Sequence, residues 1–165
     1  MYTRILVAID DSSTSAKALD EAVNLARVLG AALCIAHVAD EGPITQHGMG
    51  LGTYIDIDKV KAEIRQGGNS LLDAAQAKAA AQGLQAERIL IESTRRRVAE
   101  ALADAVQAWG ADLVVIGTHG RRGFERLLVG SVAENLVRIA ATSLMLVREG
   151  EAQASGAAAG GAQHA

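Results

Sequence analysis

The sequence predicts one α/β domain built on a parallel sheet. Short apolar runs alternate with longer segments in which apolar residues recur at helical spacing, giving five strands and four helices. The run at 5–9 is apolar throughout, as expected of a strand buried on both faces. Strands that alternate with helices in this way indicate a parallel sheet covered on both sides by helices. The chain of 165 residues provides for one domain with a substantial core.

The predicted strands cover 5–9, 33–38, 87–92, 113–116 and 144–147, and the predicted helices cover 18–29, 60–79, 98–109 and 132–140. Potential N-cap residues stand at 11–15, before the first helix. Gly30, Gly83 and Gly110 follow the first three helices, where a glycine is expected after the last turn. The pair Gly67-Gly68 falls inside the second helical pattern, which makes a kink or a break plausible there.

Two segments fall outside this alternation. Residues 41–58 hold several glycines, the only proline and few apolar residues, which is typical of a binding lid or a disordered connection. From Glu149 onward the chain is rich in Ala, Gly, Gln and Ser and has no periodicity. This composition predicts a folded domain over 1–148 and a disordered tail over 149–165.

Composition narrows the possible partners and compartments. The formal net charge of −3 gives no electrostatic reason to expect nucleic acid or an anionic membrane as a partner. Cys34 is the only cysteine, which excludes an intrachain disulfide and fits a reducing compartment; its apolar surroundings indicate a buried thiol. Apolar stretches are too short to span a bilayer, and the start lacks the cleavage site of a signal peptide. A cytoplasmic location is therefore expected.

The candidate binding site lies where the strands end, because open parallel sheets bind ligands beyond the carboxyl ends of their strands. The first strand delivers Asp10 and Asp11 to this edge, and the second delivers His37 and Val38. The fourth strand runs into a glycine- and arginine-rich stretch at 117–123.

The stretch 117–132 predicts a polyphosphate site. Ser131 and Glu134 match a capping box at the start of the fourth helix, and Gly130 lets a ligand approach the backbone. The free amides and the positive dipole end of that helix attract anions. Gly117 and Gly120 permit a tight turn, and positive charge comes from Arg121, Arg122 and Arg126. The alternative is that these glycines form only a flexible loop and a helix cap. Two glycine pairs around a capped helix make this alternative less favourable.

The pattern Gly117-x2-Gly120-x9-Gly130-Ser131 resembles the nucleotide-binding signature of the ATP-binding branch of the universal stress protein family. The runs 4–10, 33–38 and 111–117 are similar to that family's first, second and fourth strands, and the resemblance covers residues 2–148. It implies a doubly wound, Rossmann-like sheet of five parallel strands in the order 3-2-1-4-5. In that order the direction in which strands are added to the sheet reverses between strands one and four. This reversal places Asp10 and Gly117 on the two sides of one crevice.

The resemblance also implies which residues bind the nucleotide. The positions matching Ala8, Ile9 and Asp10 line the adenosine, with the acid near the ribose and phosphates, and the backbone at Val38 meets the adenine. The positions around the ribose and phosphates match Gly117, His119, Gly120, Arg121, Gly130, Ser131 and Val132. Family members commonly dimerise through the last strand, here Ser143 to Arg148, which predicts a homodimer.

Several residues depart from the family pattern or keep a second interpretation. Asp11 adds a carboxylate beside Asp10, and two acids near a triphosphate favour a bound Mg²⁺ with Asp10 as its ligand. His119 either lines the site or is an exposed turn residue, and His37 is interpreted as a packed histidine. The three arginines at 95–97 are interpreted as part of a solvated surface, with an anion contact as the second interpretation.

The predicted function is that of an ATP-binding protein acting in stress response or signalling through nucleotide-dependent conformation or dimerisation. The sequence has no Gly-Lys-Ser/Thr phosphate loop and no obvious water-orienting Gln, so at most slow ATP hydrolysis is expected and no catalytic residue is assigned. A nucleotide-free interaction module is one alternative. A phospho-receiver-like domain is another, suggested by Asp10 and Asp11, but Glu92-Ser93 and Arg148 stand near the positions where it needs an aspartate and a lysine.

Overall fold

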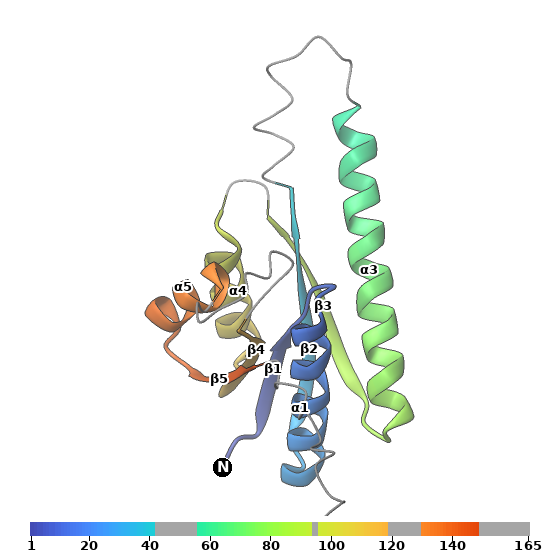
Figure 1. The fold of residues 1–165 in the computed structure, drawn as a ribbon. Helices are drawn as coiled ribbons and strands as arrows, with labels where there is room; N and C mark the ends of the chain where they lie inside the picture. The colour runs from blue at the N-terminus through green and yellow to red at the C-terminus, as the bar shows by residue number, and fades with distance from the viewer. Residues whose placement is uncertain (42–55, 94–95, 119–129, 149–165) are drawn as a thin grey trace, which may run out of the picture.

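Five parallel strands form a single sheet in the computed structural model, which describes residues 1–41, 56–93, 96–118 and 130–148 (Figure 1). The strands are β1 (Arg4–Ala8), β2 (Ala32–Asp40), β3 (Ala86–Ser93), β4 (Leu113–Gly117) and β5 (Ser143–Val147). Their order is β3-β2-β1-β4-β5, as predicted for a doubly wound, Rossmann-like sheet. Residues 42–55 and the predicted tail at 149–165 lie outside the described residues.

Four described helices cover the two faces of the sheet. The helices α1 (Ser13–Leu29) and α3 (Ile57–Ala81) pack on one face, and α4 (Val98–Trp109) and α5 (Ser131–Ile139) lie together on the other. The glycines predicted to follow the first three helices have the left-handed backbone conformation typical of helix ends. The φ angles of Gly30, Gly83 and Gly110 are 64°, 79° and 72°. No helix in the described ranges has the length and apolarity that a membrane span requires.

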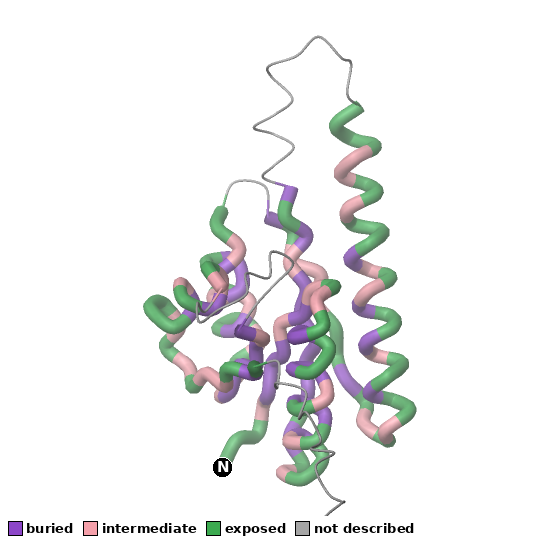
Figure 2. Tube along the Cα trace, viewed as in Figure 1, coloured by how far each residue is buried: buried purple, intermediate pink, exposed green. Residues whose placement is uncertain are grey.

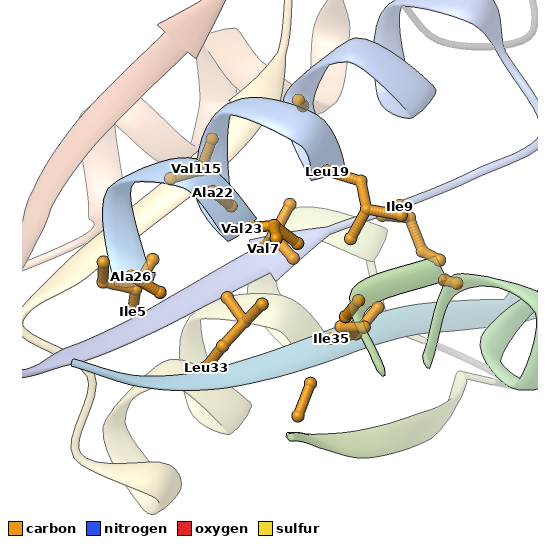
Figure 3. Packing of buried hydrophobic residues seen from close by; sticks show 14 of the residues in the cluster. Ile5, Val7, Ile9, Leu19, Ala22, Val23, Ala26, Leu33, Ile35 and Val115 are labelled. Atoms are coloured by element: carbon orange, nitrogen blue, oxygen red, sulfur yellow. The ribbon is translucent and has the colours of Figure 1, made fainter. Parts of the chain in front are cut away.

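Successive strand residues enter two separate apolar clusters, which explains why the runs at 5–9 and 113–116 are apolar throughout. On the α1 and α3 side, Ile5 and Val7 of β1 pack with Leu33 and Ile35 of β2 against α1 (Figure 3). Leu6 points the other way and joins the cluster beneath α4 and α5. The three central strands β1, β2 and β4 are mostly buried as a result, whereas the edge strands β3 and β5 are mostly exposed or half-buried (Figure 2).

The prediction that Cys34 is a core thiol is confirmed. Its side chain is fully buried in the cluster beneath α4 and α5. Burial raises the pKa of the Cys34 thiol to about 12, and the nearby Glu87 acts in the same direction. The thiol is therefore protonated at neutral pH and poorly nucleophilic.

The expected kink or break at Gly67-Gly68 is wrong, because α3 is one continuous helix from Ile57 to Ala81. Gly68 instead serves close packing. A Cβ on it would lie 2.7 Å from Cδ1 of Leu90 and 2.9 Å from Cδ2 of His37. The half of α3 that precedes Gly68 has no buried residue and extends past the sheet (Figures 1 and 2).

Candidate functional site

The carboxyl ends of β1 and β4 lie side by side and form the centre of the candidate site. Ala8 pairs with Ile116, so Ile9 and Asp10 leave the sheet beside Gly117. The chain returns to this edge at α5, because the Gly130 N–H donates to the Thr118 carbonyl oxygen at 2.6 Å. Strand β2 extends further along the same edge, as Ala36 pairs with Ala8 and Val38 lies two residues beyond.

This edge therefore carries most of the residues predicted to bind a nucleotide. The structure places eight of them at the ends of β1, β2 and β4 or at the start of α5: Ala8, Ile9, Asp10, Val38, Gly117, Gly130, Ser131 and Val132. The other three, His119, Gly120 and Arg121, lie outside the described residues.

Hydrogen bonds from the turn before α1 fix the Asp10 carboxylate. Oδ1 of Asp10 accepts from the Ser12 N–H at 3.0 Å and from Ser12 Oγ at 2.5 Å. Ser12 Oγ in turn accepts from the Ser15 N–H, which makes Ser12 the N-cap of α1. The Asp10 N–H donates to Ser15 Oγ. The serines after Asp10 thus orient the acid as well as start the helix, a second role that the cap pattern alone did not predict.

Gly117 is needed for close packing, whereas the tight turn predicted for Gly117 and Gly120 extends outside the described residues. Gly117 is the last residue of β4 and pairs with Val147 of β5. A Cβ on Gly117 would lie 2.9 Å from Cγ2 of Thr14 and 3.3 Å from the Ser15 nitrogen. The missing side chain lets the first turn of α1 lie directly against the end of β4.

The predicted capping box at Ser131 and Glu134 is wrong. Gly130 is the N-cap of α5, and Ser131 is already the first helical residue. Glu134 pairs instead with Arg138 one turn further on, at 2.7 Å. No side chain of the described residues caps α5. Amides at the start of a helix that lack such a cap can bind an anion. The Ser-x-x-Glu spacing misled because it does not specify at which residue a helix begins.

Arg97 lies beside the start of α5, which the sequence analysis did not anticipate. A cavity of about 220 Å³ is lined by Arg97, Val98 and Ala99 at the start of α4 and by Ser131, Val132 and Asn135 of α5. Two helix N-termini and an arginine therefore share one hollow, which favours negative charge. A larger groove of about 540 Å³ follows α4 from Arg96 to Gly110 and contains none of the predicted site residues.

His37 is packed, as predicted, and does not belong to a metal cluster. Its ring is buried, and Nδ1 lies 2.8 Å from the Ile9 carbonyl oxygen. Within the described ranges, no group of three or more His, Cys, Asp or Glu side chains is arranged to hold a metal ion. A Mg²⁺ ion at this edge would need oxygen ligands from the phosphates in addition to Asp10.

Comparisons with known proteins agree with this architecture. The family model described as the universal stress protein family matches residues 1–148. The universal stress protein YxiE of Bacillus subtilis is 34% identical over 151 residues, which are 90% of this chain and 100% of that protein.

Solved structures give the same result. A universal stress protein family member from Burkholderia pseudomallei is 34% identical and superposes with a TM-score of 0.71 over 88% of this chain and 96% of its own. A universal stress protein in complex with cAMP is 26% identical, with a TM-score of 0.63 over 88% of this chain and 97% of its own. From the match over 1–148, the relatives and the shared fold, this chain belongs to the universal stress protein family.

Proposed function

We propose that this protein binds ATP at the edge formed by β1, β4 and the start of α5, and that it acts in stress response or signalling. Nucleotide-dependent changes in conformation or dimerisation would carry the signal, with at most slow ATP hydrolysis. The observation that carries the proposal is the convergence of a fixed carboxylate at Asp10, the β4 end at Gly117 and the helix start at Gly130. A relative whose solved structure contains cAMP supports an adenine nucleotide as the ligand.

The nucleotide would lie across this edge in a defined direction. Its adenosine would contact Ala8, Ile9 and Val38, and its phosphates would point toward the first amides of α5. The amides of Ser131 and Val132 would meet the phosphate oxygens, since they lie at the positive end of the α5 dipole. Gly130, whose own N–H donates to Thr118, would let the phosphates approach without a side chain in the way. The proposal also assigns Gly117, His119, Gly120 and Arg121 to the ribose and phosphates.

A Mg²⁺ ion fits the geometry of Asp10. Both hydrogen bonds from Ser12 are to Oδ1, so Oδ2 is the oxygen that would bind the ion. Mg²⁺ is commonly bound by one or two carboxylates together with phosphate oxygens and water. The ion would neutralise the repulsion between the phosphates and the two acids, Asp10 and Asp11.

The proposal includes a homodimer in a cytoplasmic setting, formed by a domain over 1–148 with residues 149–165 as a tail. Strand β5 ends the sheet, so one side of it lacks a neighbouring strand among the described residues. The side chains of Leu146 on β5 and of Val137 and Ile139 on α5 are exposed nearby. A second copy that packs along Ser143 to Arg148 would cover this apolar edge.

Calorimetric titration of the purified protein with ATP, with and without Mg²⁺, tests the proposal directly. The expected result is a single adenine nucleotide site per chain with higher affinity when Mg²⁺ is present. Mass spectrometry of the denatured protein would show whether adenine nucleotides co-purify. Absence of binding under both conditions would refute nucleotide binding and favour an interaction module that works without it.

A pair of glycine substitutions provides the matched control. Gly130 has a φ of −57° and a ψ of 151°, which any residue can adopt, so Gly130→Leu does not strain the backbone. Its side chain is expected to occupy the phosphate position and abolish ATP binding. Gly67→Leu inserts the same side chain where nothing lies within 4 Å, and it should leave the affinity for ATP unchanged.

A further inference from the structure

A buried histidine holds the end of β1 beside the proposed base site. The His37 side chain is 7% exposed and its Nδ1 lies 2.8 Å from the carbonyl oxygen of Ile9. A carbonyl oxygen can only accept a hydrogen bond, so the ring must donate through a protonated Nδ1. Ile9 follows the last residue of β1 and precedes Asp10, so this bond fixes the backbone immediately next to the acid.

The bond replaces the next rung of the β1–β2 ladder. The Ile9 N–H donates to the Ala36 carbonyl oxygen at 2.9 Å, so Ala36 directs its peptide groups toward β1. Peptide groups two residues apart on a strand point to the same side, so the Val38 N–H and C=O also face β1. A regular parallel ladder would join the Val38 N–H to the Ile9 carbonyl. In the described part of the chain that carbonyl bonds the His37 ring, and no bond joins it to Val38.

The chain then turns away and cannot complete the ladder elsewhere. The Asp10 N–H donates to Ser15 Oγ in the first turn of α1 and not to β2. The donor and the acceptor of Val38 therefore face the space that β1 has left. They match the hydrogen-bonding edge of adenine: the Val38 N–H can donate to the ring nitrogen N1, and the Val38 carbonyl oxygen can accept from the 6-amino group.

The helix α3 fixes the ring from the opposite side. Gly68 lies so close that a Cβ there would be 2.9 Å from Cδ2 and 3.4 Å from Nε2 of His37. Leu90 of β3 borders the same position. The imidazole is thus confined between the Ile9 carbonyl and α3, and its orientation is set by packing as well as by the hydrogen bond.

We propose that His37 is a positioning residue for the base. Its Nδ1–H donates to the Ile9 carbonyl oxygen in place of the Val38 N–H. The N–H and C=O of Val38 therefore stay directed to an adenine. The inference rests on the proposed nucleotide function and adds to it the residue that prepares the base contact. No conclusion about catalysis follows, because His37 acts through the backbone of its neighbours.

Three variants separate positioning from packing. His37→Phe keeps an aromatic ring but removes the donor, and it should weaken ATP binding about tenfold, the effect of one lost buried hydrogen bond. His37→Asn places an amide donor near the position of Nδ1 and should restore affinity to within about threefold of the unchanged protein. Leu72→Ala removes a fully buried side chain of α3 from the same core and leaves the His37–Ile9 hydrogen bond in place, so it should lower Tm and leave the Kd for ATP unchanged.

A ligand change tests whether the loss occurs at the base. Purine riboside triphosphate lacks the 6-amino group and should bind the unchanged protein more weakly than ATP. In His37→Phe this difference should shrink, because the Val38 carbonyl is no longer held for the amino group. A purely structural role would lower the affinity for both ligands by the same factor and would overturn the proposal.

Nuclear magnetic resonance of the nucleotide-free protein tests the geometry without any ligand. We expect the Nδ1–H tautomer at His37 and faster hydrogen exchange at the Val38 amide than at the ladder amides before it in β2. His37→Phe should slow that exchange as Val38 bonds to Ile9. A protected Val38 amide in the unchanged protein would overturn the inference even if ATP binds, whereas failure of the unchanged protein to bind ATP would overturn the proposed function and the base contact together.

Discussion

The contact between Gly117 and Thr14 joins α1 to the end of β4, and it predicts a steric penalty that can be measured. Gly117→Ala places a Cβ 2.9 Å from Cγ2 of Thr14, in a position where Thr14 is almost fully buried. Overpacking of this kind should lower the free energy of unfolding by about 1–3 kcal/mol. Denaturant titration would measure the change.

The companion substitution Thr14→Ser removes the nearest methyl group. The double variant Gly117→Ala with Thr14→Ser should therefore lose less stability than the two single variants predict by addition. Part of the penalty should remain, since the Ser15 nitrogen lies only 3.3 Å from the added Cβ. Strict additivity would show that the two residues do not meet in the way that the structure describes.

The buried thiol of Cys34 predicts a dependence of stability on alkaline pH. Its pKa rises on folding from 9.0 to about 12, chiefly because burial disfavours the thiolate. The folded state therefore keeps its proton longer than the unfolded state does. This stabilisation is complete below pH 9 and is lost as the pH rises toward 12.

Thermal unfolding measured across this pH range would detect the effect by comparison with Cys34→Ala, which has no such group. The difference in stability between the two proteins should narrow above pH 9. At pH 8 the native thiol should also react far more slowly with an alkylating reagent than the denatured thiol. Equal reaction rates in the two states would contradict the burial of Cys34.

Sequence patterns located the helices and strands well but did not reveal why particular glycines occur. The second helix was predicted over 60–79 and is observed as Ile57–Ala81, with the break at Gly67-Gly68 absent. Helix propensity penalises glycine in either role and cannot distinguish a break from a close approach between layers. Whether Gly68 breaks the helix or allows a close approach depends on its neighbours Leu90 of β3 and His37 of β2, which are distant in sequence.

The two neighbouring glycines of α3 are therefore predicted to respond in opposite ways to alanine. Gly67→Ala should stabilise the protein by about 0.5–1 kcal/mol, because nothing lies within 4 Å of its Cβ and alanine favours the helix. Gly68→Ala should destabilise it, because its Cβ would overlap Leu90 and the His37 ring. Thermal unfolding of the two variants gives the test, and a shift in the same direction for both would contradict this packing of α3.

The starts of α4 and α5 predict a role for one arginine among the three at 95–97. Arg97 lines the cavity shared by the two helix N-termini, whereas Arg96 forms an ion pair with Asp104. Arg97→Ala should weaken ATP binding about threefold at low salt, since an exposed charge contributes little and is screened. Arg96→Ala is the matched control and should leave the affinity for ATP unchanged.

The number of phosphates gives a second test of the same arrangement. The loss in Arg97→Ala should be larger for ATP than for AMP, whose single phosphate lies nearer the ribose. It should also shrink as salt is raised. An equal loss for both nucleotides would place Arg97 away from the terminal phosphates.

The arrangement of the complete domain could be anticipated only in part from the residues themselves. Alternating strands and helices indicated a parallel sheet, and the strand ends indicated that Asp10, Val38 and Gly117 lie at the same edge of it. The order β3-β2-β1-β4-β5 followed from the family resemblance, because periodicity carries no information about which strands pair. The His37–Ile9 bond and the cavity at Arg97 join segments far apart in sequence, so no local pattern could reveal them.

The exposed edge of the sheet at β5 predicts which residue the proposed homodimer depends on. Leu146 on β5 is 36% exposed, and Val137 and Ile139 on the adjoining α5 are 53% and 48% exposed. An apolar edge strand of this kind favours pairing with another chain. Leu146→Lys introduces a charge that a second copy would have to bury, so it should convert the dimer into a monomer with little change in Tm. Val28→Lys is the matched control, since Val28 is 83% exposed on α1, and it should remain dimeric. Sedimentation velocity would distinguish these outcomes, and a Leu146→Lys protein that stays dimeric would exclude β5 as the interface.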